Sequence, residues 1–173
     1  FELLTNSELA MSAAKRQGGN SFRFYDRGMH RASAERVALE NDLRFAIERK
    51  ELWVAYQPCV GGREGHVVSA EALLRWNHPT LGSVAPDRFI PIAEENGLIV
   101  ELGEWIMRVA CNECRRWHDM GRNGMCVSVN VSAVQFGQPR LIESVRRALD
   151  DAGLPAWGLQ LEITESSLMK DAE

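Results

Sequence analysis

The last third of the chain alternates strand-like and helix-like segments, and this order constrains the fold more than any other feature of the sequence. Residues 126–132 and 158–164 are short, largely apolar runs, and a helical pattern over residues 139–152 separates them. Two strands that are joined through a helix pair in parallel, and the helix then covers one face of the sheet. The sequence therefore predicts an α/β fold.

The earlier part of the chain predicts a hairpin and a domain boundary. Two more strand patterns, over residues 53–60 and 66–76, flank a glycine-rich turn and predict an antiparallel pair. The other expected elements are helices over residues 5–17, 35–50, 86–95 and 98–120, a short aromatic strand over 21–25 and a loop over 77–85. Residues 27–34 are polar and contain glycine, so we expect a linker there and a new domain from residue 35.

Three oxygen-bearing side chains stand within or at the ends of the predicted strands. Glu71 interrupts an apolar strand, and Asn130 and Glu162 lie near the C-terminal ends of two others. In α/β folds these strand ends build the active site, and carboxylate and amide oxygens suit magnesium, manganese or calcium better than zinc. Arg75, four residues after Glu71, is suited to binding phosphate. The spacing alone leaves a metal site and a set of separate loop anchors equally open.

Composition and charge exclude several classes of function. The chain has 173 residues, a net charge of −4 and a pI near 5.7, so we expect no binding to DNA or RNA. Cys111 and Cys114 form a C-x-x-C, but no second such pair and no paired histidine stands at a zinc-site spacing, so the four cysteines fit a reducing, cytoplasmic setting. No segment approaches the roughly 20 apolar residues of a membrane span, although upstream segments of a longer parent could supply an anchor.

Five ordered motifs resemble the EAL domain of cyclic di-GMP phosphodiesterases. They are residues 56–58 (YQP), 70–76 (AEALLRW), 89–95 (FIPIAEE), 128–132 (SVNVS) and 162–166 (EITES). The resemblance covers residues 35–173. It implies a (β/α)8 TIM-like barrel with one antiparallel strand, which hydrolyses cyclic di-GMP to linear pGpG with magnesium or manganese and forms a homodimer.

The same resemblance implies roles for individual residues. Glu71, Asn130 and Glu162 would be metal ligands, Arg75 would contact a substrate phosphate, and Gln57 and Leu73 would line the nucleotide pocket. Glu165 would stabilise the loop that follows the next strand. The structural alternatives are a salt bridge at the barrel rim for Arg75, a hydrogen-bonded turn residue for Gln57 and a surface acid for Glu165. A degenerate EAL domain that binds cyclic di-GMP without cleaving it is the alternative function.

The N-terminal segment has a second, weaker resemblance. Residues 7–20 are similar to the closing helix of a GGDEF diguanylate cyclase domain, although Glu8 and Ser12 stand where that pattern has Asp and Tyr. Residues 1–26 would then be the C-terminal remnant of a GGDEF domain that precedes the EAL domain in the parent chain.

The chain is short for a complete barrel of this kind. A TIM barrel needs about 250 residues, so residues 35–173 correspond to about its first half. By resemblance, the later metal ligands and the general base would follow Glu173, and none of the residues present is assigned as a catalytic base. We therefore expect this chain alone to be inactive. Open sheet edges also predict that it is part of a larger molecule or pairs with a second copy.

Overall fold

The computed structural model describes residues 2–16, 20–62 and 65–163. The chain divides into two compact units, Phe1–Arg44 and Phe45–Glu173, which we call the N-terminal and C-terminal units. None of the described helices combines the length and the apolarity that a membrane crossing requires.

The N-terminal unit contains two helices, α1 (Glu2–Arg16) and α2 (Arg27–Leu43). The ring nitrogen Nε2 of His30 on α2 lies 3.1 Å from Oδ1 of Asn6 on α1. The expected strand over 21–25 is wrong, because these residues have no strand partner in the described part of the chain and are irregular. The expected loop over 27–34 is also wrong, since Asp26 caps α2 by accepting a hydrogen bond from the Gly28 amide at 2.7 Å. Whether these residues connect two domains remains a prediction.

The C-terminal unit begins with a turn and a long hairpin. The helix expected over 35–50 ends at Leu43, and residues 44–50 form a turn. Strands β1 (Leu52–Gly61) and β2 (His66–His78) then pair antiparallel, as predicted. A short strand, β3 (Gly82–Val84), pairs with the end of β2 where a loop was expected. It forms because Nδ1 of His78 accepts hydrogen bonds from the amides of Thr80 and Leu81, which turns the chain back along β2.

The parallel part of the sheet confirms the strand, helix, strand prediction. Strand β4 (Cys126–Val131) pairs in parallel with both β2 and β5 (Leu159–Ile163), which gives the order β1-β2-β4-β5 with β3 beside β2. The helices of this unit are α3 (Pro86–Glu95), α4 (Leu98–Asp119), the one-turn α5 (Ala133–Phe136) and α6 (Leu141–Ala152), followed by the 3-10 turn η1 (Ala156–Gly158). Helix α5 was not expected from the sequence.

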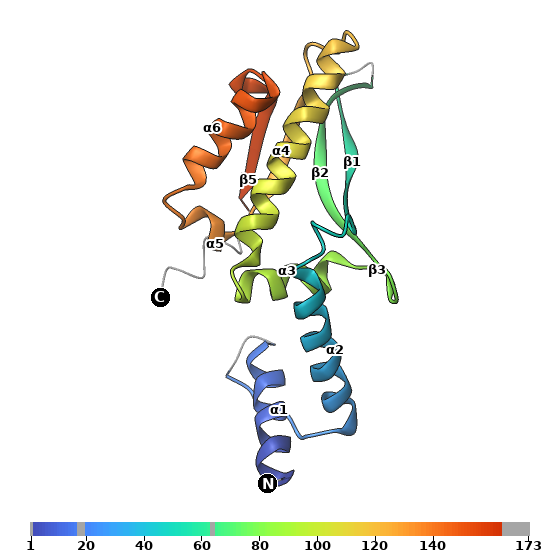
Figure 1. Cartoon of the computed structure of the whole chain (residues 1–173), viewed down its shortest axis with the longest axis vertical. Coiled ribbons are helices and arrows are strands. Elements are labelled where there is room, and N and C mark those ends of the chain that lie inside the picture. The colour runs from blue at the N-terminus through green and yellow to red at the C-terminus, as the bar shows by residue number, and fades with distance from the viewer. Residues whose placement is uncertain (1, 17–19, 63–64, 164–173) are drawn as a thin grey trace. The chain divides into compact units, whose positions relative to one another are not determined.

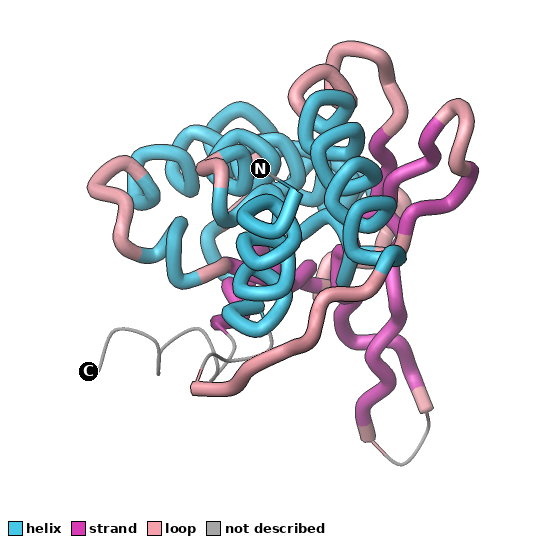
Figure 2. The backbone as a smooth tube through the Cα atoms, turned by 90° about the horizontal axis from the view of Figure 1, so that it is seen from below, coloured by secondary structure: helices cyan, strands magenta, loops and turns pink. Residues whose placement is uncertain are grey.

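The helices cover one face of the sheet. Helix α4 runs between α6 and the β1–β2 hairpin (Figure 1), and in Figure 2 the hairpin lies beside the helical layer. The core buries small and branched side chains of β2 and β4, among them Ala72, Val127 and Val129, against Met107 and Cys111 of α4. Because side chains alternate along a strand, the neighbours of these apolar residues point to the other face. That face carries the polar residues of interest.

Candidate functional site

The strand register gathers the candidate residues on the face of the sheet that the helices do not cover. Gln57 of β1 lies opposite Glu71 of β2, and Asn130 of β4 lies beside Glu162 of β5. Residues paired across neighbouring strands point to the same face. The two-residue period of β2 adds Leu73 and Arg75 to the face of Glu71.

One direct contact links two of the predicted metal ligands. Nδ2 of Asn130 donates a hydrogen bond of 2.7 Å to Oε1 of Glu71. Glu71 and Glu162 are half-buried and Asn130 is exposed. The bond uses the amide nitrogen of Asn130, whereas ligation of a cation would use its oxygen Oδ1. Register places Glu162 next to Asn130, so two carboxylates and one amide come together at adjacent strands.

These donors fit a hard divalent cation. Oxygen ligands of this kind suit magnesium, manganese or calcium. Within the described ranges, no three His, Cys, Asp or Glu side chains are placed to hold a metal by themselves. The candidate set therefore depends on the amide of Asn130 in addition to its two carboxylates.

A cavity of about 300 Å³ opens at the C-terminal ends of β2 and β4. Leu73, Arg75 and Asn130 line it, together with side chains of α3, α4 and α5, whereas Gln57, Glu71 and Glu162 are not among its lining residues. Nη1 of Arg75 donates a hydrogen bond of 2.9 Å to the carbonyl of Leu74. Arg75 forms no ion pair with any described residue, so the structure gives no support to a rim salt bridge.

Two cavity residues were missed from the sequence, although a signal for them was present. Ser132 and Gln135 form a capping box at the start of α5. The backbone amide and the hydroxyl of Ser132 each donate a hydrogen bond of 3.1 Å to the side-chain oxygen Oε1 of Gln135. In return, the backbone amide of Gln135 donates to the Ser132 hydroxyl at 3.3 Å. The pattern S-x-x-Q marks such a box in a sequence. The capping box fixes the chain two residues after Asn130, and its two residues complete the wall of the cavity.

Gly103 of α4 allows α5 to approach this closely. A Cβ atom at this position would collide with the side-chain amide of Gln135, which is 4% exposed. A glycine inside a helix costs roughly 1 kcal/mol relative to alanine, so its position needs a packing reason, and the amide of Gln135 supplies one. Glu165, the predicted loop-stabilising acid, lies outside the described residues.

Comparison with known families agrees with this arrangement. A model of the EAL domain matches residues 40–173. The chain belongs to the EAL family. The match includes both strands of the hairpin and every residue discussed above as part of the candidate site.

The curated relatives of this EAL chain are much longer proteins. It is 44% identical over 172 residues to the bifunctional diguanylate cyclase/cyclic di-GMP phosphodiesterase MucR of Pseudomonas aeruginosa, with 99% of the chain and 25% of MucR covered. It is 41% identical over 168 residues to the cyclic di-GMP phosphodiesterase NbdA of the same organism, with 97% of the chain and 22% of NbdA covered. The chain thus spans about a quarter of the length of these relatives.

Solved EAL structures share the fold. The chain matches the PaMucR phosphodiesterase in complex with c-di-GMP with a TM-score of 0.74 and 46% identity, over 78% of this chain and 55% of that one. It also matches the EAL enzyme Bd1971, bound to cAMP and cyclic di-GMP, with a TM-score of 0.74 and 28% identity, over 98% of this chain and 45% of that one. The mixed sheet with its antiparallel β1 is therefore part of a TIM-barrel-like EAL fold, as expected. EAL phosphodiesterases as a class depend on a divalent metal ion.

Proposed function

We propose that the protein containing this chain hydrolyses cyclic di-GMP to linear pGpG. The observation behind the proposal is the contact between Asn130 and Glu71, with Glu162 at the adjacent register position and Arg75 in the neighbouring cavity. The names of the similar proteins support the same activity, because MucR and NbdA are both called cyclic di-GMP phosphodiesterases. We propose this activity for the intact protein, of which the chain supplies part of the barrel.

The metal in this proposal is magnesium or manganese, held by Glu71, Asn130 and Glu162. A bound divalent cation would supply Lewis-acid stabilisation of phosphoryl oxygens and lower the pKa of water. Arg75 would bind a phosphate of the substrate with its guanidinium, which offers several donors in a planar fork. Leu73 and Gln57 would flank the nucleotide, and Glu165 would stabilise a neighbouring loop. None of these residues is proposed as the general base.

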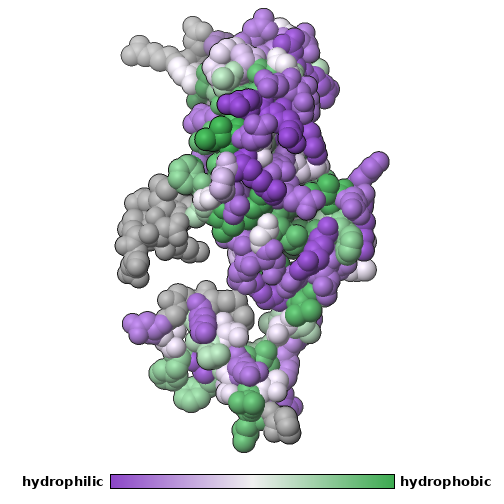
Figure 3. Space-filling model, turned by 60° about the vertical axis from the view of Figure 1, so that its left-hand side comes forward, coloured by the Kyte–Doolittle hydropathy of each residue, from purple (hydrophilic) through white to green (hydrophobic). Residues whose placement is uncertain are grey.

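The same proposal includes a second domain upstream of the EAL domain in the parent chain. The match to MucR, which is named as a cyclase as well as a phosphodiesterase, covers 99% of this chain and therefore continues N-terminal to residue 40. The N-terminal unit also exposes apolar side chains that further chain could cover, since Leu3, Phe22 and Phe24 are each at least 80% exposed. Figure 3 shows apolar residues among the polar surface. Both observations support a GGDEF domain upstream, with residues 1–26 as its C-terminal remnant.

A homodimer and a cytoplasmic location complete the proposal. In the described sheet, β1 and β5 each pair with a neighbour on one side only, so further backbone is needed to cover both edges. More of the barrel and a second copy would together provide it. The four cysteines are free thiols, which fits a reducing compartment. The receptor alternative is not favoured, because the candidate ligands are all present and the relatives named above are phosphodiesterases.

Turnover by the intact protein tests this function. With manganese, it should convert cyclic di-GMP to pGpG, and Glu71→Gln should reduce turnover by at least about a hundredfold because a carboxylate ligand is lost. Glu101→Gln, an exposed glutamate in the first turn of α4, is the matched control and should leave turnover unchanged. Unchanged turnover in Glu71→Gln would exclude the ligand assignment, and binding without any cleavage would favour the receptor.

A further inference from the structure

Glu51 is a largely buried carboxylate that contacts the end of β2. It directly precedes β1, and its side chain is 10% exposed. Its Oε2 accepts a hydrogen bond of 3.0 Å from the indole Nε1 of Trp76. Its backbone carbonyl accepts a second bond, of 2.9 Å, from the amide of Asn77. One residue therefore holds two consecutive residues of β2, through its side chain and its backbone.

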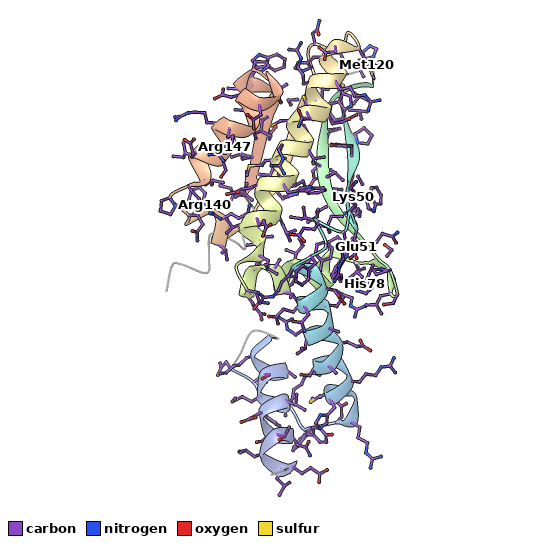
Figure 4. The ribbon with its side chains drawn as sticks, viewed as in Figure 1. Lys50, Glu51, His78, Met120, Arg140 and Arg147 are labelled. Carbon is purple, nitrogen blue, oxygen red and sulfur yellow. The ribbon has the colours of Figure 1, made fainter. Side chains whose placement is uncertain are left out.

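The turn before β1 directs Glu51 toward β2. The amide of Glu51 donates to the carbonyl of Ala46 at 3.0 Å, and Lys50 has a φ of +57°, in the left-handed region. A non-glycine residue keeps such a conformation where its surroundings require it. Figure 4 shows Lys50, Glu51 and His78 at the same end of the hairpin.

A long ion pair with a half-exposed arginine does not account for the burial of Glu51. Nη1 of Arg49 is 4.0 Å from Oε1 of Glu51, and the arginine side chain is 48% exposed. Pairs of this kind contribute little to stability. Burying a carboxylate is costly unless it is hydrogen-bonded, and the indole of Trp76 satisfies Oε2.

Trp76 transmits this contact to the cavity wall. Its side chain is 1% exposed and packs edge-on against Phe89 of α3, with ring centroids 5.6 Å apart, and against His78 at 5.2 Å. Helix α3 lines the cavity through Ile90 and Glu94. The indole therefore lies between the end of β2 and a helix that forms the opposite wall.

Arg75 directly precedes Trp76 and points to the other face of β2. Because consecutive side chains of a strand point in opposite directions, the rotation of the strand that places the Trp76 ring also places the Arg75 guanidinium. We propose that Glu51 is a positioning residue for phosphate binding: by holding Trp76, it fixes Arg75 in the cavity. This inference rests on the proposed function, because it assigns Arg75 to the phosphate of cyclic di-GMP.

A double-mutant cycle in the intact protein tests the inference. Glu51→Ala should raise KM for cyclic di-GMP by about three- to tenfold, which is the size of effect expected from the loss of one typical intramolecular hydrogen bond. In an Arg75→Ala background the same substitution should change KM by less than about twofold, because residues that act through each other are not additive. Glu51→Gln should rescue KM, since its side-chain carbonyl can still accept from Trp76. Glu48→Ala, an exposed glutamate of the same turn, is the control.

The outcomes separate this inference from the function on which it rests. A purely structural role for Glu51 predicts equal losses with and without Arg75, and that result would overturn the inference while cyclic di-GMP turnover by the unmutated protein stayed intact. Absence of turnover in the unmutated protein would overturn the function and the inference together. If Glu51→Ala does not fold, Trp76→Phe removes the donor and keeps an aromatic ring. The same dependence on Arg75 is then expected, and equal losses would overturn the inference.

Discussion

Asn130 of β4 donates a hydrogen bond of 2.7 Å to Glu71 of β2, although 59 residues separate the two in sequence. The contact depends on the parallel pairing of β2 with β4, in which Glu71 lies beside Ser128 and Asn130 stands two residues further toward the strand end. Side chains that are offset by two residues on the same face are close enough to meet. The pairing thus converts two isolated polar residues into one polar site.

Replacing the amide by a third carboxylate tests this site without measuring activity. In Asn130→Asp, the hydrogen bond to Glu71 is lost and two like charges face each other, so we expect the free energy of unfolding to fall by roughly 1–2 kcal/mol when divalent metal is chelated. Manganese should restore the melting temperature, because a cation would neutralise the repulsion. Gln138→Glu, in an exposed loop position, should show neither effect. A variant that stays as stable as the original in chelator would argue against the contact.

Tyr56 offers a test of the core between the hairpin and α4. Its hydroxyl is a buried side-chain oxygen without a hydrogen-bond partner among the described residues, and its ring packs edge-on against Trp117 with centroids 5.2 Å apart. Burial, with Glu113 nearby, raises the pKa of this hydroxyl far above its ordinary value. Because an unsatisfied buried hydroxyl is costly, Tyr56→Phe should be neutral or stabilise the protein by about 1 kcal/mol. Thermal unfolding measures this, and a clear loss of stability would reveal a partner for the hydroxyl.

Strongly patterned segments of the fold could be predicted from the sequence. Strand β2, the long helix α4 and strand β4 each bury several of their residues, so their apolar residues follow the period of the element. Strands β1 and β5 are only partly buried, and they are recognised from their apolar runs and the turn residues that flank them. The missed elements are short and depend on particular contacts. Helix α5 has four residues and forms on a capping box, and β3 has three and follows the hydrogen bonds of His78.

The site could be predicted in its residues but not in its geometry. Glu71, Asn130 and Glu162 stand out because polar side chains interrupt apolar strands. Their proximity requires the strand order and register, which no local pattern encodes. The same holds for Gly103, whose role becomes visible when Gln135 is placed against it. The functional roles of these residues remain predictions.

The buried thiols predict a dependence of stability on pH. Burial, with Cys114 nearby, raises the pKa of Cys111 from 9.0 to about 12, and burial, with Cys126 nearby, raises that of Cys114 from 9.0 to about 11. Between pH 9 and 11 the unfolded chain therefore loses protons that the folded chain keeps, so the free energy of unfolding should fall as pH rises. The melting temperature of the protein should therefore fall as pH rises, whereas that of the Cys111→Ala/Cys114→Ala variant should fall less, so the difference between the two should change with pH. Cys59→Ala, at an exposed position, should retain the full fall.

The effect of Gly103→Ala on stability should change sign when the Gln135 side chain is removed. Alanine is favoured over glycine inside a helix by roughly 1 kcal/mol, so Gly103→Ala would be stabilising if the position had space. The new Cβ would collide with the end of the Gln135 side chain, which could move aside only by giving up the hydrogen bonds that its Oε1 accepts from Ser132. We therefore expect Gly103→Ala to destabilise the protein by about 1–3 kcal/mol.

Removing the obstructing side chain should reverse this sign. In a Gln135→Ala background, which is itself destabilised by the loss of the capping box, adding Gly103→Ala should raise the melting temperature. Circular dichroism on the four members of the cycle measures the interaction. If Gly103→Ala had the same effect in both backgrounds, the collision with Gln135 would not be what requires glycine at this position of α4. The amide of Gln135 would then not be what holds α5 and the chain after Asn130 against that helix.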